Sequence, residues 1–547
     1  MCDYSAEYLD SVADQWLTYT CPHPKLAKQN TDGDGLCIFH SENAEKDLAL
    51  FSEEFKKLYE SGPHEFIGFV FPERFSFQEL YEADDSLEFV DANFALVHFN
   101  CTADFRGVQF YGQGETNFSR AEFSGRGRTD FSGAQFSGQG GTNFSGAQFS
   151  GQRGTDFRRA EFTGGGTYFV STEFSGQGGT NFSWAQFSGQ GGTDFSFAEF
   201  SGEMGTFFGA VKFSVESVTN FKKALFANKN GTYITGCTFQ SHTSFRYVKV
   251  KTYFSLENCI FHDYVEFIGS NKSEEEEANY IFNESSEVDF RNVTFLKPQN
   301  VIFNMVDLRK ARFLNTDLLG VRMGQVDWQV EDNRYVVYDE KLVDKEDIND
   351  KDDVAVKENI NDKDDDADKD IVTHREVAHL YKQLRSVYES TGRYFEAGDF
   401  FYGEMEMRRK QKGPREGRFL QVLLWLYRLI SYYGERPLRA LAWLGGTILF
   451  FTPLYFFFGL RSKPNAVESE FIRYKLAFAK PDIEFWSDLV KTFFYSISNF
   501  TLGRTFTDLA PLNNWSTGFS ILESIIGVVI ITLFALSINR KLKRTKD

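Results

Sequence analysis

Cysteine is scarce in this sequence: only 6 residues among 547, and their positions do not show the spacing of a disulfide scaffold. The N-terminus, MCDYSAEYLD, is acidic and lacks the basic start of a secretory signal peptide. Both absences argue against a disulfide-stapled extracellular module. We therefore expect most of the chain to be cytoplasmic and its thiols to be reduced.

An excess of positive charge is also absent. Lys and Arg number 59 against 77 Asp and Glu, which gives a net charge of −18, and much of the negative charge falls in one linker. A basic surface for binding nucleic acid is therefore not indicated. Histidine is rare, with 8 residues, and we could assemble no set of nucleophile, base and orienting group from them. The sequence predicts that the protein is not an enzyme.

Phenylalanine is the extreme of the composition, with 61 residues, and its distribution is periodic from Phe94 onward. Pairs of Phe five residues apart recur about every thirteen residues; examples are Phe118 and Phe123, Phe131 and Phe136, and Phe144 and Phe149. Each five-residue piece, such as TNFSG or AQFSG, has a small or polar residue two positions before Phe. The pattern resembles the pentapeptide-repeat family. This resemblance implies a right-handed, quadrilateral β-solenoid (a four-sided β-helix) over residues 91–330.

A narrow solenoid has room for one large and one small side chain per face, so we expect each Phe, and the Ala or Thr two residues before it, to point inward. Near Val306 the same register places four more side chains inward, namely Leu308, Phe313, Leu318 and Met323. Cys237 and Cys259 occupy small inward positions, which favours core residues over catalytic thiols. Coils of about 26 residues spaced about 4.8 Å apart predict eight or nine coils.

Four residues near the N-terminus have the types and spacing of metal ligands. Cys21 and His23 form a C-x-H pattern, and Cys37 and His40 form a C-x-x-H pattern. Two thiolates and two imidazoles can hold a structural zinc in a segment too small to build its own core. The alternative is that they are buried thiols and surface imidazoles. An amphipathic helix over 42–61 completes an N-terminal cap, residues 1–90.

The C-terminal quarter contains two apolar runs, 440–460 and 516–539, each long enough to span a bilayer. Between them, 485–500 is apolar and helical in pattern but too short to cross, which is typical of a re-entrant helix and loop. Basic residues flank the whole segment on both sides, so we expect a multi-pass protein of the cell membrane with both termini cytoplasmic. Glu523 lies within the second run. It indicates a polar partner near the loop or a water-filled cavity, or else a position at the interface end of the helix.

The remaining domains are expected between the solenoid and the membrane. Residues 331–373 are rich in Lys and Asp and predict an acidic, disordered linker. Residues 374–413 predict a cytoplasmic α-helical hairpin that breaks at Gly392. Residues 414–435 predict an interfacial helix before the transmembrane pore domain, 436–547.

The stretch FFYSISNFTLGRTFTDLAP, followed by GFSILESIIGVVIITLFALSI, resembles the pore helix, filter and inner helix of the two-transmembrane-helix potassium-channel superfamily. Those channels carry Thr-x-Gly-Tyr-Gly-Asp. Here the corresponding residues are Thr501, Leu502, Gly503, Arg504, Thr505 and, two positions later than in that pattern, Asp508. The resemblance implies a homotetramer that conducts a monovalent ion, with Glu523 and Gly527 as inner-helix and gating residues.

The first hypothesis is therefore an oligomeric ion channel whose solenoid is a cytoplasmic assembly or regulatory domain for an unknown protein or ligand. The alternative is a membrane-anchored pentapeptide-repeat binding platform without conduction. A third hypothesis, a solenoid that mimics DNA, is disfavoured because 115–227 contains about as many basic as acidic side chains.

Overall fold

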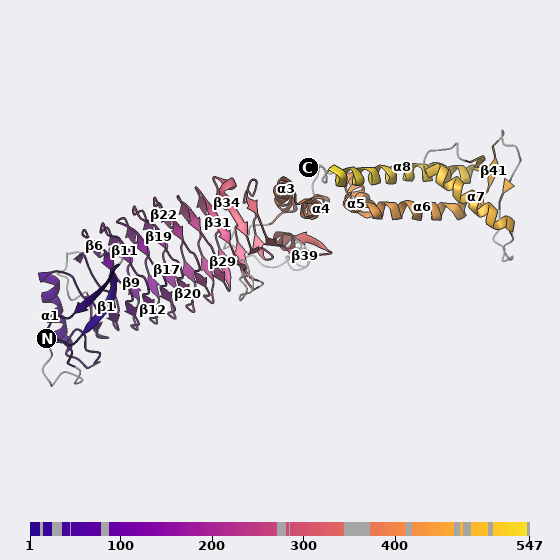
Figure 1. Cartoon of the computed structure of the whole chain (residues 1–547). Helices are drawn as coiled ribbons and strands as arrows, with labels where there is room; N and C mark the ends of the chain where they lie inside the picture. Colours follow the sequence, from indigo (N-terminus) through magenta and orange to yellow (C-terminus); the bar gives the residue numbers. More distant parts are fainter. Residues whose placement is uncertain are drawn as a thin grey trace, which may run out of the picture. The chain divides into compact units, whose positions relative to one another are not determined.

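The computed structural model describes residues 1–10, 15–24, 35–43, 45–77, 87–270, 280–283, 285–343, 372–411, 418–463, 471–473, 483–500 and 507–543. The chain forms two compact units, Met1–Val387 and Tyr388–Asp547. The first unit contains a β-solenoid of about nine turns, and the second consists mainly of helices (Figure 1).

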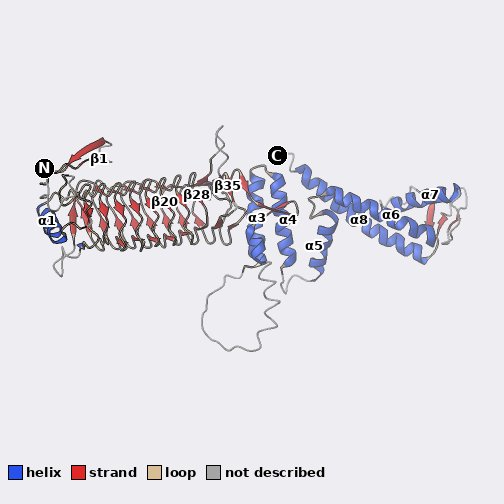
Figure 2. Cartoon of the chain, turned by 90° about the horizontal axis from the view of Figure 1, so that it is seen from below, coloured by secondary structure: helices blue, strands red, loops and turns tan. Residues whose placement is uncertain are grey.

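Each turn of the solenoid contributes one short strand to each of four parallel sheets. One turn consists of β10 (Gln135–Phe136), β11 (Thr142–Asn143), β12 (Gln148–Phe149) and β13 (Thr155–Asp156), after which β14 (Glu161–Phe162) pairs in parallel with β10. The sheets run from β4 (Glu88–Val90) to β33 (Thr294–Phe295), from β7 (Thr116–Asn117) to β37 (Arg322–Met323), from β3 (Val70–Phe71) to β28 (Lys249–Val250), and from β9 (Thr129–Asp130) to β36 (Ala311–Arg312). Figure 2 shows these strands stacked in register. The stack begins with β3 and β4, within the range assigned above to the N-terminal cap.

The core of the solenoid is a set of phenylalanine columns. Phe144 is fully buried, and its ring lies 4.9 Å from that of Phe118 in the preceding turn and 5.0 Å from that of Phe169 in the next. Thr142 and Ala147 are buried as well, so the predicted inward register is confirmed. The other residues predicted to point inward are also buried: Cys237, Cys259, Leu308, Phe313, Leu318 and Met323.

The N-terminal end of the stack is covered by α1 (Leu48–Ser61), which begins after Asp47, whose carboxylate accepts a hydrogen bond from the amide of Leu50. Phe51 and Phe55 of this helix are fully buried, and their rings pack edge-on against Phe71 in β3. An antiparallel hairpin, β1 (Ser5–Asp10) and β2 (Gln15–Thr20), precedes the helix. The hairpin was not predicted.

The C-terminal end of the stack carries a hairpin, β39 (Gln329–Glu331) and β40 (Arg334–Val336), and the helix α3 (His374–Ser390). Arg334 and Glu340 form a buried ion pair at 2.8 Å, and the Tyr381 hydroxyl of α3 donates to the Glu340 carboxylate. Residues 334–343, expected to belong to a disordered linker, are therefore ordered and largely buried, and the Arg334–Glu340 pair and Tyr381 help to hold them. The rest of that linker, 344–371, lies outside the described residues.

Asp339, next to this ion pair, predicts a pH dependence of stability. Its carboxylate accepts from the Phe313 amide at 3.1 Å, and burial raises its pKa from 3.8 to about 7, with a smaller contribution from Asp289 that Arg312 opposes. The folded state keeps this proton up to about pH 7, whereas the unfolded chain loses it near its ordinary pKa of about 3.9. The free energy of unfolding should therefore fall as the pH rises through this range.

Asp339→Asn keeps the acceptor oxygen and removes the ionisation. We expect the stability of this variant relative to the natural chain to increase by about 3 kcal/mol between about pH 4.5 and about pH 8. Thermal unfolding midpoints at the two pH values measure the difference. A difference that is the same at both would show that Asp339 does not bind a proton in this range.

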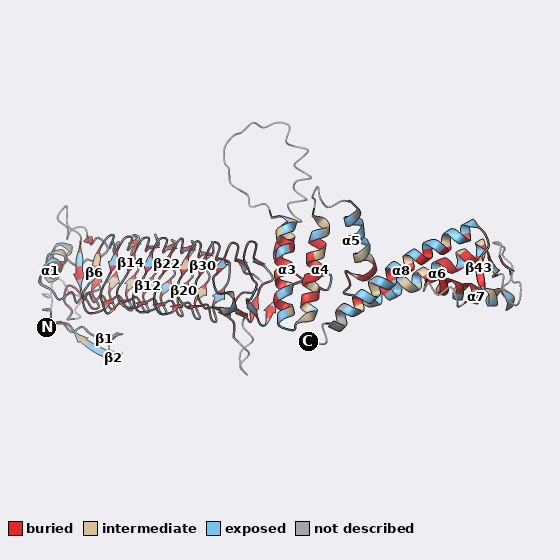
Figure 3. Cartoon of the chain, turned by 90° about the horizontal axis from the view of Figure 1, so that it is seen from above, coloured by how far each residue is buried: buried red, intermediate tan, exposed pale blue. Residues whose placement is uncertain are grey.

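The second unit contains α4 (Tyr394–Lys410), α5 (Arg418–Ser431), α6 (Pro437–Phe458), α7 (Ile483–Phe500) and α8 (Asn514–Lys543). The break before α4 lies at the predicted Gly392, whose φ is +72°. Two helices, α6 and residues 514–539 of α8, are long and apolar enough to cross a membrane. They pack against each other, and α7 packs against both. Figure 3 shows buried residues where α6 and α7 lie together.

A small antiparallel sheet joins the connections between these helices. Its strands are β41 (Leu460–Ser462), β42 (Phe471–Ile472) and β43 (Leu509–Pro511), with β41 in the centre. β41 follows α6 and β43 precedes α8, so the sheet ties the end of one candidate span to the start of the other.

Candidate functional site

Three thiols and one imidazole converge beside the β1–β2 hairpin. The ligand atoms of Cys2, Cys21, Cys37 and His40 all lie within 4.8 Å of one another, and all four residues are buried. The Cys37 sulfur lies 3.7 Å from the Cys21 sulfur and 3.1 Å from Nδ1 of His40. A Cys₃His set is one of the usual ligand sets of structural zinc sites, so this cluster has the donors to bind a metal.

Backbone pairing creates the cluster. Cys2 precedes β1 and Cys21 follows β2, and the amide of Cys21 donates to the Tyr4 carbonyl, which brings the two ends of the hairpin together. Cys37 and His40 occupy one tight turn, in which the His40 amide donates to the Cys37 carbonyl at 3.2 Å. The Cys37 amide in turn donates to the Cys2 sulfur at 3.1 Å, which joins the turn to the hairpin.

The surroundings of His40 orient it as a ligand. Its Nε2 lies 2.9 Å from the Ile67 carbonyl oxygen, so a proton on Nε2 leaves Nδ1 free to face the thiols. The Tyr4 ring stacks on the imidazole with centroids 3.8 Å apart. The hydrogen bond with Cys37 lowers the pKa of the Cys21 thiol, and together with burial it raises the pKa of Cys37 to about 12. A bound metal would replace the proton between these sulfurs.

The cluster differs in one member from the set predicted by spacing. His23 does not belong to it: its ring packs edge-on against Phe39 at 5.0 Å and Phe69 at 6.0 Å. Cys2 supplies the fourth ligand atom. The available signal was weak: segments rich in Tyr, Leu, Trp and Thr flank residues 11–14, and pairing them as two strands would place Cys2 beside Cys21.

Most of the predicted filter, namely Thr501, Leu502, Gly503, Arg504 and Thr505, lies outside the described residues. The next predicted residue, Asp508, has an exposed side chain, and its carbonyl accepts a hydrogen bond from the amide of Lys463 at 2.6 Å. Asp508 therefore stands at the edge of the β41–β43 pairing, directly before β43.

Glu523 is fully buried where α6, α7 and α8 meet. Its carboxylate accepts from the Tyr455 hydroxyl of α6 at 2.7 Å and from the Ser496 hydroxyl of α7. Asn499 of α7 donates to the same tyrosine oxygen at 3.4 Å. The carboxylate thus joins α8 to both other helices through polar groups.

Gly527, one turn further along α8, allows α7 to approach closely. A Cβ atom at this position would lie 2.8 Å from the carbonyl oxygen of Phe500 and 3.1 Å from its Cγ. Any larger residue would push the end of α7 away, so Gly527 serves the packing of α7 on α8.

Comparisons of the chain with protein-family models, with curated proteins and with solved structures gave no match.

Proposed function

We propose that the protein is a subunit of an oligomeric membrane ion channel, a homotetramer with a potassium-channel-like pore. The observation that carries the proposal is α7, an 18-residue helix that packs against two longer helices of spanning length and is joined to them through Glu523. A single helical hairpin cannot enclose a pore, so conduction requires several copies around one axis. The proposal takes α7 as a re-entrant pore helix and the residues after it as the filter for a monovalent ion.

The proposed topology places both termini in the cytoplasm of a cell-membrane protein. Basic residues on both sides of the span region support it: Arg408, Arg409 and Lys410 before α5, and Arg540, Lys541 and Lys543 at the end of α8. The first unit is then a cytoplasmic pentapeptide-repeat domain, right-handed and four-sided, that assembles the channel or binds a cytoplasmic protein or ligand. No catalytic role is proposed for any part.

For the filter region we propose a cation pore of weak selectivity, in which Arg504 is held away from the axis. Arg504 and Thr505 stand where a potassium filter has Tyr and Gly, and an inward arginine in each of four copies would repel cations. Both oxygens of Glu523 accept hydrogen bonds from hydroxyl groups, which leaves Asp508 as the proposed acidic partner that holds Arg504 away from the axis.

Reversal potentials of the purified full chain in planar bilayers under a potassium chloride gradient test this function. We expect a reversal potential displaced toward the potassium potential. A shift to the chloride potential would contradict the cation pore, and no current from a protein verified as a tetramer would contradict conduction itself. That last result would favour the second candidate, a membrane-anchored binding platform, which the departures at Arg504 and Thr505 also favour.

A further inference from the structure

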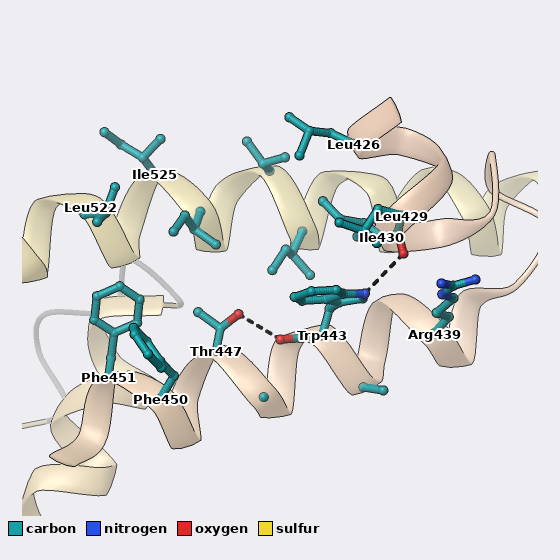
Figure 4. A pocket seen from close by; sticks show the side chains of 15 residues that line it. Leu426, Leu429, Ile430, Arg439, Trp443, Thr447, Phe450, Phe451, Leu522 and Ile525 are labelled. Atoms are coloured by element: carbon teal, nitrogen blue, oxygen red, sulfur yellow. Dashed lines mark hydrogen bonds between the residues drawn. The ribbon is translucent and has the colours of Figure 1, made fainter. Parts of the chain in front are cut away.

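An apolar groove of about 810 Å³ runs between α5, α6 and α8 (Figure 4). Its lining includes Leu426 of α5, Trp443, Gly446 and Phe450 of α6, and Ile525 and Val529 of α8. Thr447 also lines the groove, but its hydroxyl donates to the Trp443 carbonyl at 2.8 Å. The lining of the groove is therefore apolar along both helices of spanning length. The side chains of Phe450 and Ile525, which face the groove, remain 64% and 59% exposed.

Positive charge gathers at one end of this groove. Arg439, in the first turns of α6, lies at that end beside Trp443 and Ile430 (Figure 4). Arg439 and Arg436 both stack on the ring of Tyr432, at 5.7 Å and 4.4 Å. Among the residues that the structure describes, neither guanidinium forms an ion pair with a carboxylate. By contrast, Arg428 of α5 lies 3.5 Å from the Glu406 carboxylate.

Trp443 indicates where the charged end of the groove would lie relative to the membrane surface. Its indole N–H donates to the Leu429 carbonyl at 3.1 Å, near the end of α5. Tryptophan and arginine at the start of a spanning helix are typical of the membrane–water interface. The groove would therefore extend from the headgroup region, at Arg439, into the hydrocarbon core, at Phe450 and Leu522.

We propose that this groove binds a phospholipid of the bilayer, with an acyl chain along α6 and α8 and an anionic headgroup phosphate at Arg439 and Arg436. Guanidinium groups form strong, charge-assisted hydrogen bonds with phosphate, and acyl chains match the apolar lining. A second copy of the chain is the other possible occupant, and the test below separates the two. The proposal rests on the membrane insertion of α6 and α8 within the proposed function and not on conduction.

Fluorescence quenching by brominated lipids tests this proposal on the full chain in vesicles. The difference between the natural chain and Trp443→Phe isolates the signal of Trp443, which lines the groove. We expect brominated phosphatidylglycerol to quench Trp443 at about a fivefold lower mole fraction than brominated phosphatidylcholine. Arg439→Gln should remove most of this preference and leave quenching by both lipids. Equal quenching by the two lipids in the natural chain would overturn the headgroup site.

Two neighbouring glycines provide a matched pair for the groove itself. A Cβ atom at Gly445 or Gly446 would meet no atom within 4 Å, yet only Gly446 lines the groove. We expect Gly446→Leu to fill the groove and reduce Trp443 quenching by both lipids, and Gly445→Leu to leave it unchanged.

Equal behaviour of the two leucine variants would overturn the proposal. A second outcome would also overturn it: the Gly446→Leu protein dissociates into single chains while the quenching of Trp443 is unchanged. The groove would then be a contact between copies of the chain. The remaining tryptophans separate this proposal from the proposed function. If they are quenched in Trp443→Phe, the helices are inserted; if no tryptophan is quenched in either protein, the insertion fails and the lipid site with it.

Discussion

Replacing Phe144 by Ala is expected to lower the free energy of unfolding of the solenoid by about 3–5 kcal/mol. The ring is fully buried and stacks between Phe118 and Phe169, so its removal leaves a cavity in a core one side chain wide. In a domain of this size the loss corresponds to a thermal unfolding midpoint roughly 6–20 °C lower. The loss of the far-ultraviolet β signal of the purified full chain on heating measures it.

Ser145→Ala is the matched control, because it changes the next residue, which is only partly buried. The backbone of Ser145 makes two hydrogen bonds: its amide donates to the side-chain oxygen of Asn143, and its carbonyl accepts from the amide of Arg120. We expect a shift within about 0.5 kcal/mol. Similar losses from both substitutions would show that the core is not organised around the phenylalanine columns.

Purified without chelators, the full chain is expected to carry about one zinc per chain, and Cys37→Ser is expected to lose it. Cys37 contacts the other three residues of the cluster. Its sulfur lies beside the Cys21 sulfur and the His40 imidazole, and its amide donates a hydrogen bond to the Cys2 sulfur. Structural zinc contributes directly to folding, so the variant should also lose protection of the β1–β2 hairpin. Elemental analysis measures the metal, and hydrogen exchange of residues 5–20 measures the hairpin.

Two further variants decide which ligand set is correct. The geometry predicts that Cys2→Ser loses the metal whereas His23→Ala keeps it, because the His23 ring packs on Phe39 and Phe69 away from the cluster. The opposite result would favour the set deduced from spacing. Natural protein without any metal would contradict the metal site altogether.

The solenoid could be predicted because its pattern is local and repeated. Pairs of phenylalanines five residues apart recur about every thirteen residues, each with a small or polar residue two positions before it. This pattern determines which side chains point inward, and stacking then follows coil by coil. The members of the thiol cluster were harder to predict, because Cys2 and Cys21 become neighbours only through the β1–β2 pairing, and the sequence between these strands carries no strong turn signal. Three of the four cluster members were identified from their types and spacing; the fourth required a tertiary contact.

In the second unit, length and hydropathy were sufficient to locate α6 and α8 within a few residues. They could not reveal the partners of Glu523, since Tyr455 and Ser496 come from two other helices and are separated from it by long stretches of sequence. Gly527 was assigned to gating by resemblance, whereas its surroundings show a steric role against Phe500. Whether Gly527 also takes part in gating stays a prediction.

The phenylalanine columns have a consequence for how the molecule can change in evolution. Each coil contacts only the coils before and after it, and equivalent residues such as Phe136 and Phe162 are 26 positions apart in register. Duplicating or deleting one coil would therefore change the length of the stack by about 4.8 Å and leave both ends intact. The number of coils therefore sets the distance between the thiol cluster at one end of the stack and the Arg334–Glu340 pair at the other. This distance can change only in steps of one strand spacing.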